Sequence, residues 1–232
     1  MSQKKINAFL ELLINAKVGN QVYSFNHVDN PYAKGENSNQ YRNLKQYLTQ
    51  MHAMKPTVLL VGEAPGYNGC KLTGIPFTSE RVMSENDFFK DYSVNRDTNN
   101  KIRTEATATK VWPVFDKLRV LNKMPLLWNI FPYHPHEKGN PEKSNRAPLK
   151  DEINFGFDVL KHLLEMFESI DTVYAVGHKA EAKINSETSV IEILNKRRKK
   201  SGKVNHSENI YIKHPSYGGK EKFKKDIEEY LH

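Results

Sequence analysis

Four short apolar runs recur along the chain, and each ends where polar residues begin. They lie at 57–61, 125–131, 172–176 and 209–213. Segments with helical periodicity separate or follow them, at 105–121, 149–168, 178–200 and 219–231. Apolar runs this short predict strands buried on both faces, and their alternation with helices predicts parallel βαβ units. We therefore expect an α/β fold, a three-layer α/β/α sandwich around a central, mainly parallel four-stranded sheet.

The segment that precedes the first strand is expected to be helical. Apolar residues recur at helical spacing in 3–17 and again in 38–53, with a polar loop between them. No internal repeat, low-complexity segment or clear linker interrupts the chain. We predict one domain over 1–232, composed of an N-terminal helical part, 1–55, and a core, 56–219.

Composition excludes several classes of protein. Of 232 residues, 38% are hydrophobic and 27% charged, which is ordinary for a globular chain and not for a disordered one. The single cysteine, Cys70, cannot form an internal disulfide framework, a four-cysteine zinc site or a four-cysteine iron–sulfur cluster. No apolar stretch approaches the ~20 residues of a membrane span, and no signal peptide is recognisable. We expect a cytoplasmic monomer.

The charge favours a polyanionic partner. Lys and Arg number 35 against 27 Asp and Glu, a net charge of +8. Such an excess is typical of nucleic-acid binding, although many basic proteins bind none. The densest run is 196–200, Lys-Arg-Arg-Lys-Lys. It is interpreted either as the solvated end of a helix or as a source of non-specific DNA affinity.

Polar residues follow each predicted strand. Gly62-Glu-Ala-Pro-Gly66 follows the first, Asn129 lies in the second, Gly177-His178 follows the third, and His214-Pro-Ser216 follows the fourth. Ligands of open α/β sheets bind beyond the carboxyl ends of the strands. These residues are therefore expected to line one concave polar site.

These motifs together resemble the uracil-DNA glycosylase superfamily. The resemblance rests on Gly62-Glu-Ala-Pro-Gly66, Phe77, Asn129 and His214-Pro-Ser216, in this order, and it covers residues 57–219. It implies an enzyme that extrudes a nucleotide from DNA and cleaves its glycosidic bond. DNA containing uracil or a modified pyrimidine is the implied partner, single- or double-stranded. No metal or organic cofactor is implied.

The resemblance also implies roles for individual residues. Phe77 would stack on the base, Asn129 would accept from N3–H and donate to O4, and His214 would donate to O2 of the departing anion. The first motif would pass close to base and sugar, so the substrate-binding residues would include Gly62, Ala64, Pro65, Gly66 and Tyr67.

The sequence departs from the family at the position that orients the attacking water. Another branch has an aspartate at the third position of the first motif, where this chain has Ala64. Glu63 is the nearby carboxylate. Either Glu63 activates the water, or the reaction depends chiefly on stabilising the anion and the oxocarbenium-like sugar. The branch with an iron–sulfur cluster also begins with this motif, but Cys70 alone cannot hold one.

A second departure lies beside C5 of the base. The branch that excludes thymine carries a tyrosine where this chain has Gly66, and some relatives carry a glutamate where it has Gly69. Either the space is open to C5-substituted pyrimidines, as in modified viral DNA, or it is filled by Tyr67 or by a residue of 80–104.

Residues after the fourth strand are expected to engage DNA. Ser216 and backbone N–H groups would hold phosphates, Tyr217 would fill the gap left by the flipped base, and Lys220 flanks them. His134 and His136 suggest a metal site, but without a third ligand they are better interpreted as a solvent-facing loop.

The sequence therefore predicts a monofunctional DNA glycosylase that leaves an abasic site, with Glu63, Asn129 and His214 as its catalytic residues. Its role would be DNA repair or defence against modified foreign DNA. The alternatives are a non-catalytic nucleic-acid-binding protein on the same fold, favoured by Ala64, and a hydrolase of free nucleosides.

Overall fold

A parallel four-stranded sheet forms the centre of the computed structural model, which describes residues 2–94, 101–202, 211–216 and 218–231. Its strands are β4 (Val58–Gly62), β5 (Leu126–Asn129), β7 (Thr172–Val176) and β8 (Tyr211–Ile212). They lie in the order β5-β4-β7-β8, and every pair is parallel. The predicted α/β fold and four-stranded sheet are confirmed.

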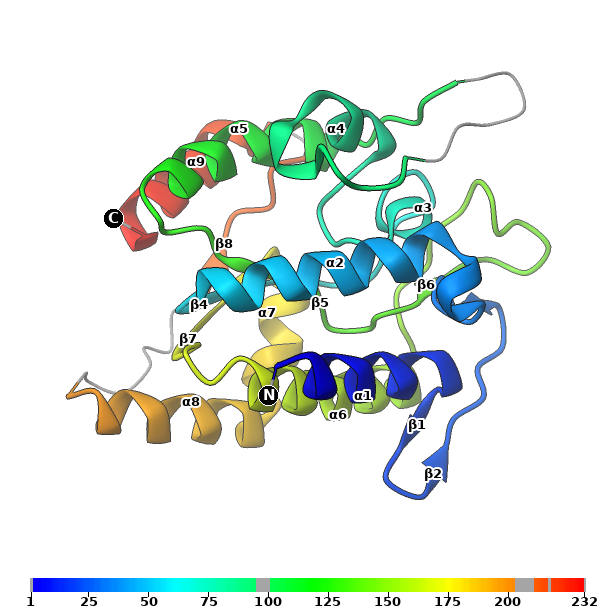
Figure 1. The fold of residues 1–232 in the computed structure, drawn as a ribbon, viewed down its shortest axis with the longest axis horizontal. Helices are drawn as coiled ribbons and strands as arrows, with labels where there is room; N and C mark the ends of the chain where they lie inside the picture. The colour runs from blue at the N-terminus through cyan, green and yellow to red at the C-terminus, as the bar shows by residue number, and fades with distance from the viewer. Residues whose placement is uncertain (1, 95–100, 203–210, 217, 232) are drawn as a thin grey trace.

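Helices cover the sheet on both sides. In Figure 1, α5 and α9 lie together above the sheet, and α1, α6 and α8 lie below it. The described helices are α1 (Ser2–Asn15), α2 (Asn39–Met54), α3 (Cys70–Thr73), α4 (Glu80–Glu85), α5 (Ala106–Val120), α6 (Lys150–Met166), α7 (His178–Asn185), α8 (Thr188–Lys200) and α9 (Lys220–Leu231), with 3₁₀ turns at Gly35–Asn37 and Asp87–Phe89. Both N-terminal helices were predicted, and their apolar faces join the same hydrophobic cluster as the sheet.

The structure corrects the prediction of one helix over 178–200. The chain breaks at Ser186, whose hydroxyl donates to the Lys183 carbonyl, and a second helix begins at Thr188. Short polar side chains that bond to nearby backbone compete with helical hydrogen bonds. The helical periodicity on either side hides such a break.

Short antiparallel pairings also lie in segments where no strand was expected. Strand β1 (Lys17–Val18) pairs with β2 (Gln21–Val22), and β3 (Val28–Asp29) pairs with β6 (His134–Pro135). Two-residue strands carry no periodic signal, because alternation needs at least four residues. The β3–β6 pair ties the N-terminal segment to the chain that follows β5.

A glycine in α6 allows that helix to cross directly over the end of β5. A Cβ added to Gly156 would lie 2.1 Å from the carbonyl oxygen of Ile130 and 3.2 Å from Cα of Phe131. Both neighbours are backbone atoms, so a side-chain rotation cannot relieve the overlap. The helix itself would have to move.

We expect Gly156→Ala to lower the free energy of unfolding by about 1–3 kcal/mol, the usual cost of overpacking. Alanine is a better helix former than glycine by about 1 kcal/mol. A net loss of stability in Gly156→Ala would therefore come from the steric clash. Gly66→Ala is the matched control, because a Cβ there meets only the Asn145 side chain, at 3.9 Å. Urea denaturation of both variants tests this, and an unchanged Gly156→Ala variant would contradict the close crossing.

Candidate active site

The carboxyl ends of the strands open into one cleft of about 1210 Å³. Ten of the predicted site residues line it together: Gly62, Glu63, Ala64, Pro65, Gly66, Tyr67, Phe77, Asn129, His214 and Ser216. Lys220 is exposed at the start of α9 and does not line the cleft. Tyr217 lies outside the described residues. The sheet thus brings together residues that are up to 154 positions apart in sequence, from Gly62 to Ser216.

Strand register places the first motif against Asn129. Gly62 is the register partner of Asn129 in the β4–β5 pair. A Cβ added to Gly62 would lie 2.6 Å from Asn129 Oδ1 and 2.9 Å from Phe77 Cζ. Asn129 and Phe77 therefore both lie against the backbone of Gly62, and only glycine leaves them room.

Phe77 is held in an unusual backbone conformation. Its φ is +57°, a left-handed value that non-glycine residues rarely adopt. The indole N–H of Trp112 donates to the Phe77 carbonyl oxygen at 2.9 Å. Strain of this kind persists where neighbours fix the chain, and here it turns the phenyl ring toward the cleft at Gly62.

His214 presents a defined tautomer to the cleft. Its Nδ1 lies 2.6 Å from the hydroxyl oxygen of Ser216 and 3.3 Å from the backbone nitrogen of Ser216. The backbone N–H can only donate, so Nδ1 must accept and the ring proton resides on Nε2. The imidazole therefore keeps one N–H free to donate to a ligand.

Burial keeps this imidazole neutral. Desolvation lowers the pKa of His214 below its ordinary value, and the carboxylates of Glu105 and Glu63 oppose that shift without overcoming it. A neutral ring holds a hydrogen-bond donor in the cleft without a permanent charge. Gly177 makes room for it, because a Cβ there would lie 3.3 Å from His214 Cβ.

The Glu63 carboxylate is paired with lysines of α7. Lys183 forms an ion pair with Oε1, and Lys179 Nζ lies 3.9 Å from Oε2. Both lysines lie on one face of the helix that follows β7, four residues apart. Sequence reasoning did not include Lys183, because its role depends on packing between α7 and the end of β4.

His134 and His136 are buried, which corrects their interpretation as a solvent-facing loop. Nδ1 of His134 lies 2.8 Å from the Pro65 carbonyl oxygen, and Nε2 lies 3.1 Å from the Pro141 carbonyl oxygen. His134 therefore holds the backbone of the first motif in place through its contact with Pro65. Among the described residues, no group of three or more His, Cys, Asp or Glu side chains is placed to hold a metal ion.

The space beside Gly69 is covered. A Cβ added to Gly69 would lie 2.9 Å from the carbonyl oxygen of Thr78 and 3.1 Å from Glu105 Cγ. The Glu105 carboxylate accepts from the N–H groups of Thr107 and Ala108, so it caps α5 while its stem lines the cleft. This residue lies one position beyond the segment 80–104 considered from the sequence. Its approach to Gly69 depends on the packing of α5 and could not be predicted from the sequence.

The basic run at 196–200 lies away from the cleft. Arg197 donates to the carbonyls of Leu164, Phe167 and Ile170, and Arg198 contacts Asp171 and Thr172 at the start of β7. The run therefore stands at the amino end of the sheet, and two of its charges are structural. Basic side chains that do line the cleft are Arg81, Lys110, Arg146 and Lys179.

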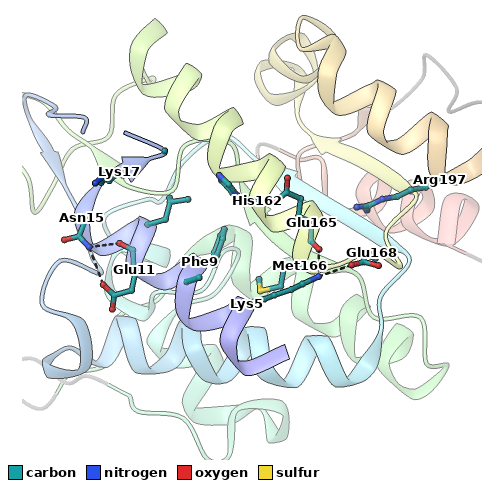
Figure 2. Close-up of a pocket in the computed structure, with 13 residues that line it drawn as sticks. Lys5, Phe9, Glu11, Asn15, Lys17, His162, Glu165, Met166, Glu168 and Arg197 are labelled. Carbon is teal, nitrogen blue, oxygen red and sulfur yellow. Dashed lines mark hydrogen bonds and ion pairs between the residues drawn. The ribbon is translucent and has the colours of Figure 1, made fainter. Parts of the chain in front are cut away.

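A second hollow lies between α1 and α6 (Figure 2). Its lining includes the apolar side chains of Phe9 and Met166, and several of its charged side chains are already engaged. Lys5 forms an ion pair with Glu168 at 2.9 Å, and Arg197 reaches the carbonyls named above. We interpret the hollow as a gap between two packed helices and not as a functional site.

The structure is that of an α/β protein with a polar cleft at the carboxyl ends of its strands, lined among others by Phe77, Asn129 and His214. The family model of the uracil DNA glycosylase superfamily matches residues 48–232, and the chain belongs to that superfamily. The crystal structure of wild-type SMUG2 of Pedobacter heparinus superposes with a TM-score of 0.60 and 17% identity, over 96% of this chain and 95% of that one. Among curated proteins, no sequence matches this chain. At this identity the structural likeness shows a common fold.

Gly62→Ala should abolish most activity without unfolding the protein. The new Cβ would displace the Asn129 and Phe77 side chains from their positions in the cleft, and misplacement of substrate-contacting groups by 1 Å can cost about 10²-fold in rate. Single-turnover cleavage measures the loss, and circular dichroism verifies the fold. A folded variant with the wild-type rate would show that Asn129 and Phe77 do not hold the substrate.

Proposed function

We propose that the chain is a monofunctional DNA glycosylase that hydrolyses the N-glycosidic bond of uracil or a related C5-modified pyrimidine and leaves an abasic site. The observation that carries the proposal is His214: a half-buried neutral imidazole whose Nδ1 is occupied by Ser216 and whose Nε2–H is free in the cleft. Membership of the superfamily supports the reaction class.

The flipped base would stack on Phe77 with its Watson–Crick edge at Asn129. As the glycosidic bond breaks, negative charge develops on the pyrimidine, and Nε2–H of His214 donates to O2. A donor that is already oriented stabilises this charge without reorganisation. Asn129 reads the edge by accepting from N3–H and donating to O4.

Glu63 would act at the sugar rather than at the departing base. Its carboxylate can hold the attacking water or stabilise the oxocarbenium-like sugar, and Lys183 fixes its direction. Ala64 supplies no functional group at the next position. Lys183 donates to Glu63, so an imine pathway with strand cleavage is not part of the proposal.

DNA would approach the end of the sheet where the cleft opens. Lys179 and Arg81 line the cleft and remain exposed, with side-chain exposures of 74% and 53%. Ser216, Tyr217 and Lys220 would contact the strand beside the flipped nucleotide, as the motif implies. The chemistry is the same whether it serves repair or removal of modified foreign DNA.

In the part of the chain that the structure describes, every helix is too short or too polar to span a membrane.

An oligonucleotide with one labelled uracil tests the reaction. Wild-type protein should generate an alkali-labile site at the uracil and leave the strand intact before alkali. His214→Ala should retain DNA binding and lose about 10²–10³-fold in single-turnover rate, the usual cost of one preorganised donor. Ser216→Ala should lose less, because the imidazole remains.

Binding without cleavage by the wild type would favour the non-catalytic alternative. Cleavage of free deoxyuridine at a comparable rate would favour the nucleoside hydrolase. Near-normal turnover by His214→Ala would remove that residue from the mechanism.

Selectivity at C5 should depend on Glu105. The approach beside Gly66 leads to Asn145 and has room for a small group, whereas Glu105 covers Gly69. Glu105→Ser keeps an N-cap residue for α5 and shortens the stem. Its rate with a bulky C5 substituent, relative to uracil, should rise by about 10-fold or more, since steric exclusion discriminates strongly. An unchanged ratio would place C5 elsewhere in the cleft.

A further inference from the structure

His178 follows the end of β7 and lines the cleft, but the proposed reaction gives it no role. Its imidazole ring lies against the phenol ring of Tyr211, with 4.1 Å between the ring centroids and 9° between the ring planes. The two rings are therefore stacked face to face. Tyr211 covers one face of the imidazole, yet the His178 side chain is 76% exposed, so its other face is open.

Backbone and side-chain contacts hold this pair of rings in place. Nδ1 of His178 lies 3.0 Å from Oε2 of Glu181, which lies one turn further along α7. A carboxylate only accepts, so Nδ1–H donates and restricts the rotation of the ring. Tyr211 lies in β8, and the N–H of Gly177 donates to the Ile212 carbonyl at 2.9 Å, which ties the end of β7 to β8. An aromatic face that is fixed in this way loses little conformational entropy when a ligand binds to it.

The open imidazole face lies close to the residue that would act on the flipped base. A Cβ added to Gly177 would lie 3.3 Å from Cβ of His214, and His178 is the next residue along the chain. Lys179 follows, lines the same cleft and has a side chain that is 74% exposed. A nucleic-acid strand offers a base for an aromatic face and a phosphate for a cation at each nucleotide. His178 and Lys179 together match that pattern.

We propose that His178, supported by Tyr211, is a stacking platform for the nucleobase next to the flipped nucleotide. Every base has a flat π face, so the platform adds affinity with little sequence preference. A neighbouring base within an intact duplex is already paired and stacked, and it gains little from the platform. The inference rests on the function proposed above and deepens it, because it assigns a second nucleotide subsite to the same cleft.

Equilibrium binding to short single-stranded oligonucleotides tests the platform. The intact probe carries one 2′-fluoro-2′-deoxyuridine, whose glycosidic bond resists hydrolysis, so that binding is measured without cleavage. In two further probes a tetrahydrofuran spacer removes the base on the 5′ side or on the 3′ side of this nucleotide and retains the phosphates. Fluorescence anisotropy gives the dissociation constants, and thermal unfolding verifies that each variant is folded at the assay temperature.

His178→Ala should weaken binding of the intact probe by about 5-fold or more, which is the usual worth of one stack between a base and an aromatic ring. In the wild type, the spacer on one side of the uridine should cause a loss of similar size. In His178→Ala the same spacer should change the dissociation constant little, because the ring on which that base would stack is already absent. A residue that only stabilises the fold would show no such coupling.

Two substitutions separate the ring from its hydrogen bond. His178→Phe retains an aromatic face, and its affinity for the intact probe should stay within about 3-fold of the wild type. His178→Asn retains a donor for Glu181 but has no ring, and it should lose as much affinity as His178→Ala.

His162→Ala is the matched control. Nδ1 of His162 lies 3.3 Å from Oε2 of Glu165, three residues further along its helix, and the His162 side chain is 44% exposed. His162 lines the hollow between α1 and α6 and does not line the cleft. Its replacement should leave every dissociation constant unchanged. A fully paired duplex with the same uridine should in turn respond little to His178→Ala.

Equal effects of each spacer in the wild type and in a folded His178→Ala variant would overturn the inference. Wild-type affinity in His178→Asn, or no binding of the intact probe by the wild type, would overturn it as well. A protein that cleaves uracil without this coupling retains the proposed function and loses the platform. A protein that shows the coupling and cleaves no uracil retains the platform and loses the proposed function. The two failures are thus distinguishable.

Discussion

The close approach of two strand ends at Gly62 is the constraint on which the site depends. Parallel pairing puts Gly62 in register with Asn129, and the absence of a side chain lets Asn129 and Phe77 both lie against its backbone. In the proposed function, a base bound there meets an amide at its edge and a phenyl ring on its face. The remaining groups of the cleft are arranged around these two.

Most residues of the candidate site are held by a neighbour outside the sequence motifs. These pairs are Phe77 with Trp112, Pro65 with His134, Glu63 with Lys183, and Asn129 with Cys70, whereas His214 is held by Ser216 of its own motif. Catalysis by charge stabilisation requires groups that do not reorganise during the reaction. The supporting contacts come from buried or half-buried residues, where hydrogen bonds compete little with water. Preorganisation is thus a property of the packing around the motifs.

The charged side chains are not distributed over the molecule as the net positive charge of the chain suggests. The densest basic run caps α6 and pairs with Asp171 at the amino end of the sheet. At the opposite end, Glu63 and Glu105 face His214 beside Lys110 and Lys179. The cleft therefore combines both signs, with exposed cations toward its opening. Affinity for a phosphate backbone would come from scattered lysines and arginines rather than from one run.

The sequence alone determined the strands, the main helices and the motifs at the strand ends, because burial on both faces leaves a continuous apolar signal and parallel strands align their carboxyl ends. Periodicity could not reveal the break at Ser186, since polar side chains there bond locally within an otherwise helical pattern. Nor could it place Glu105 over Gly69, Lys183 against Glu63 or Cys70 behind Asn129. Those contacts join residues 36 to 120 positions apart, and only the packing of helices on the sheet sets their distances.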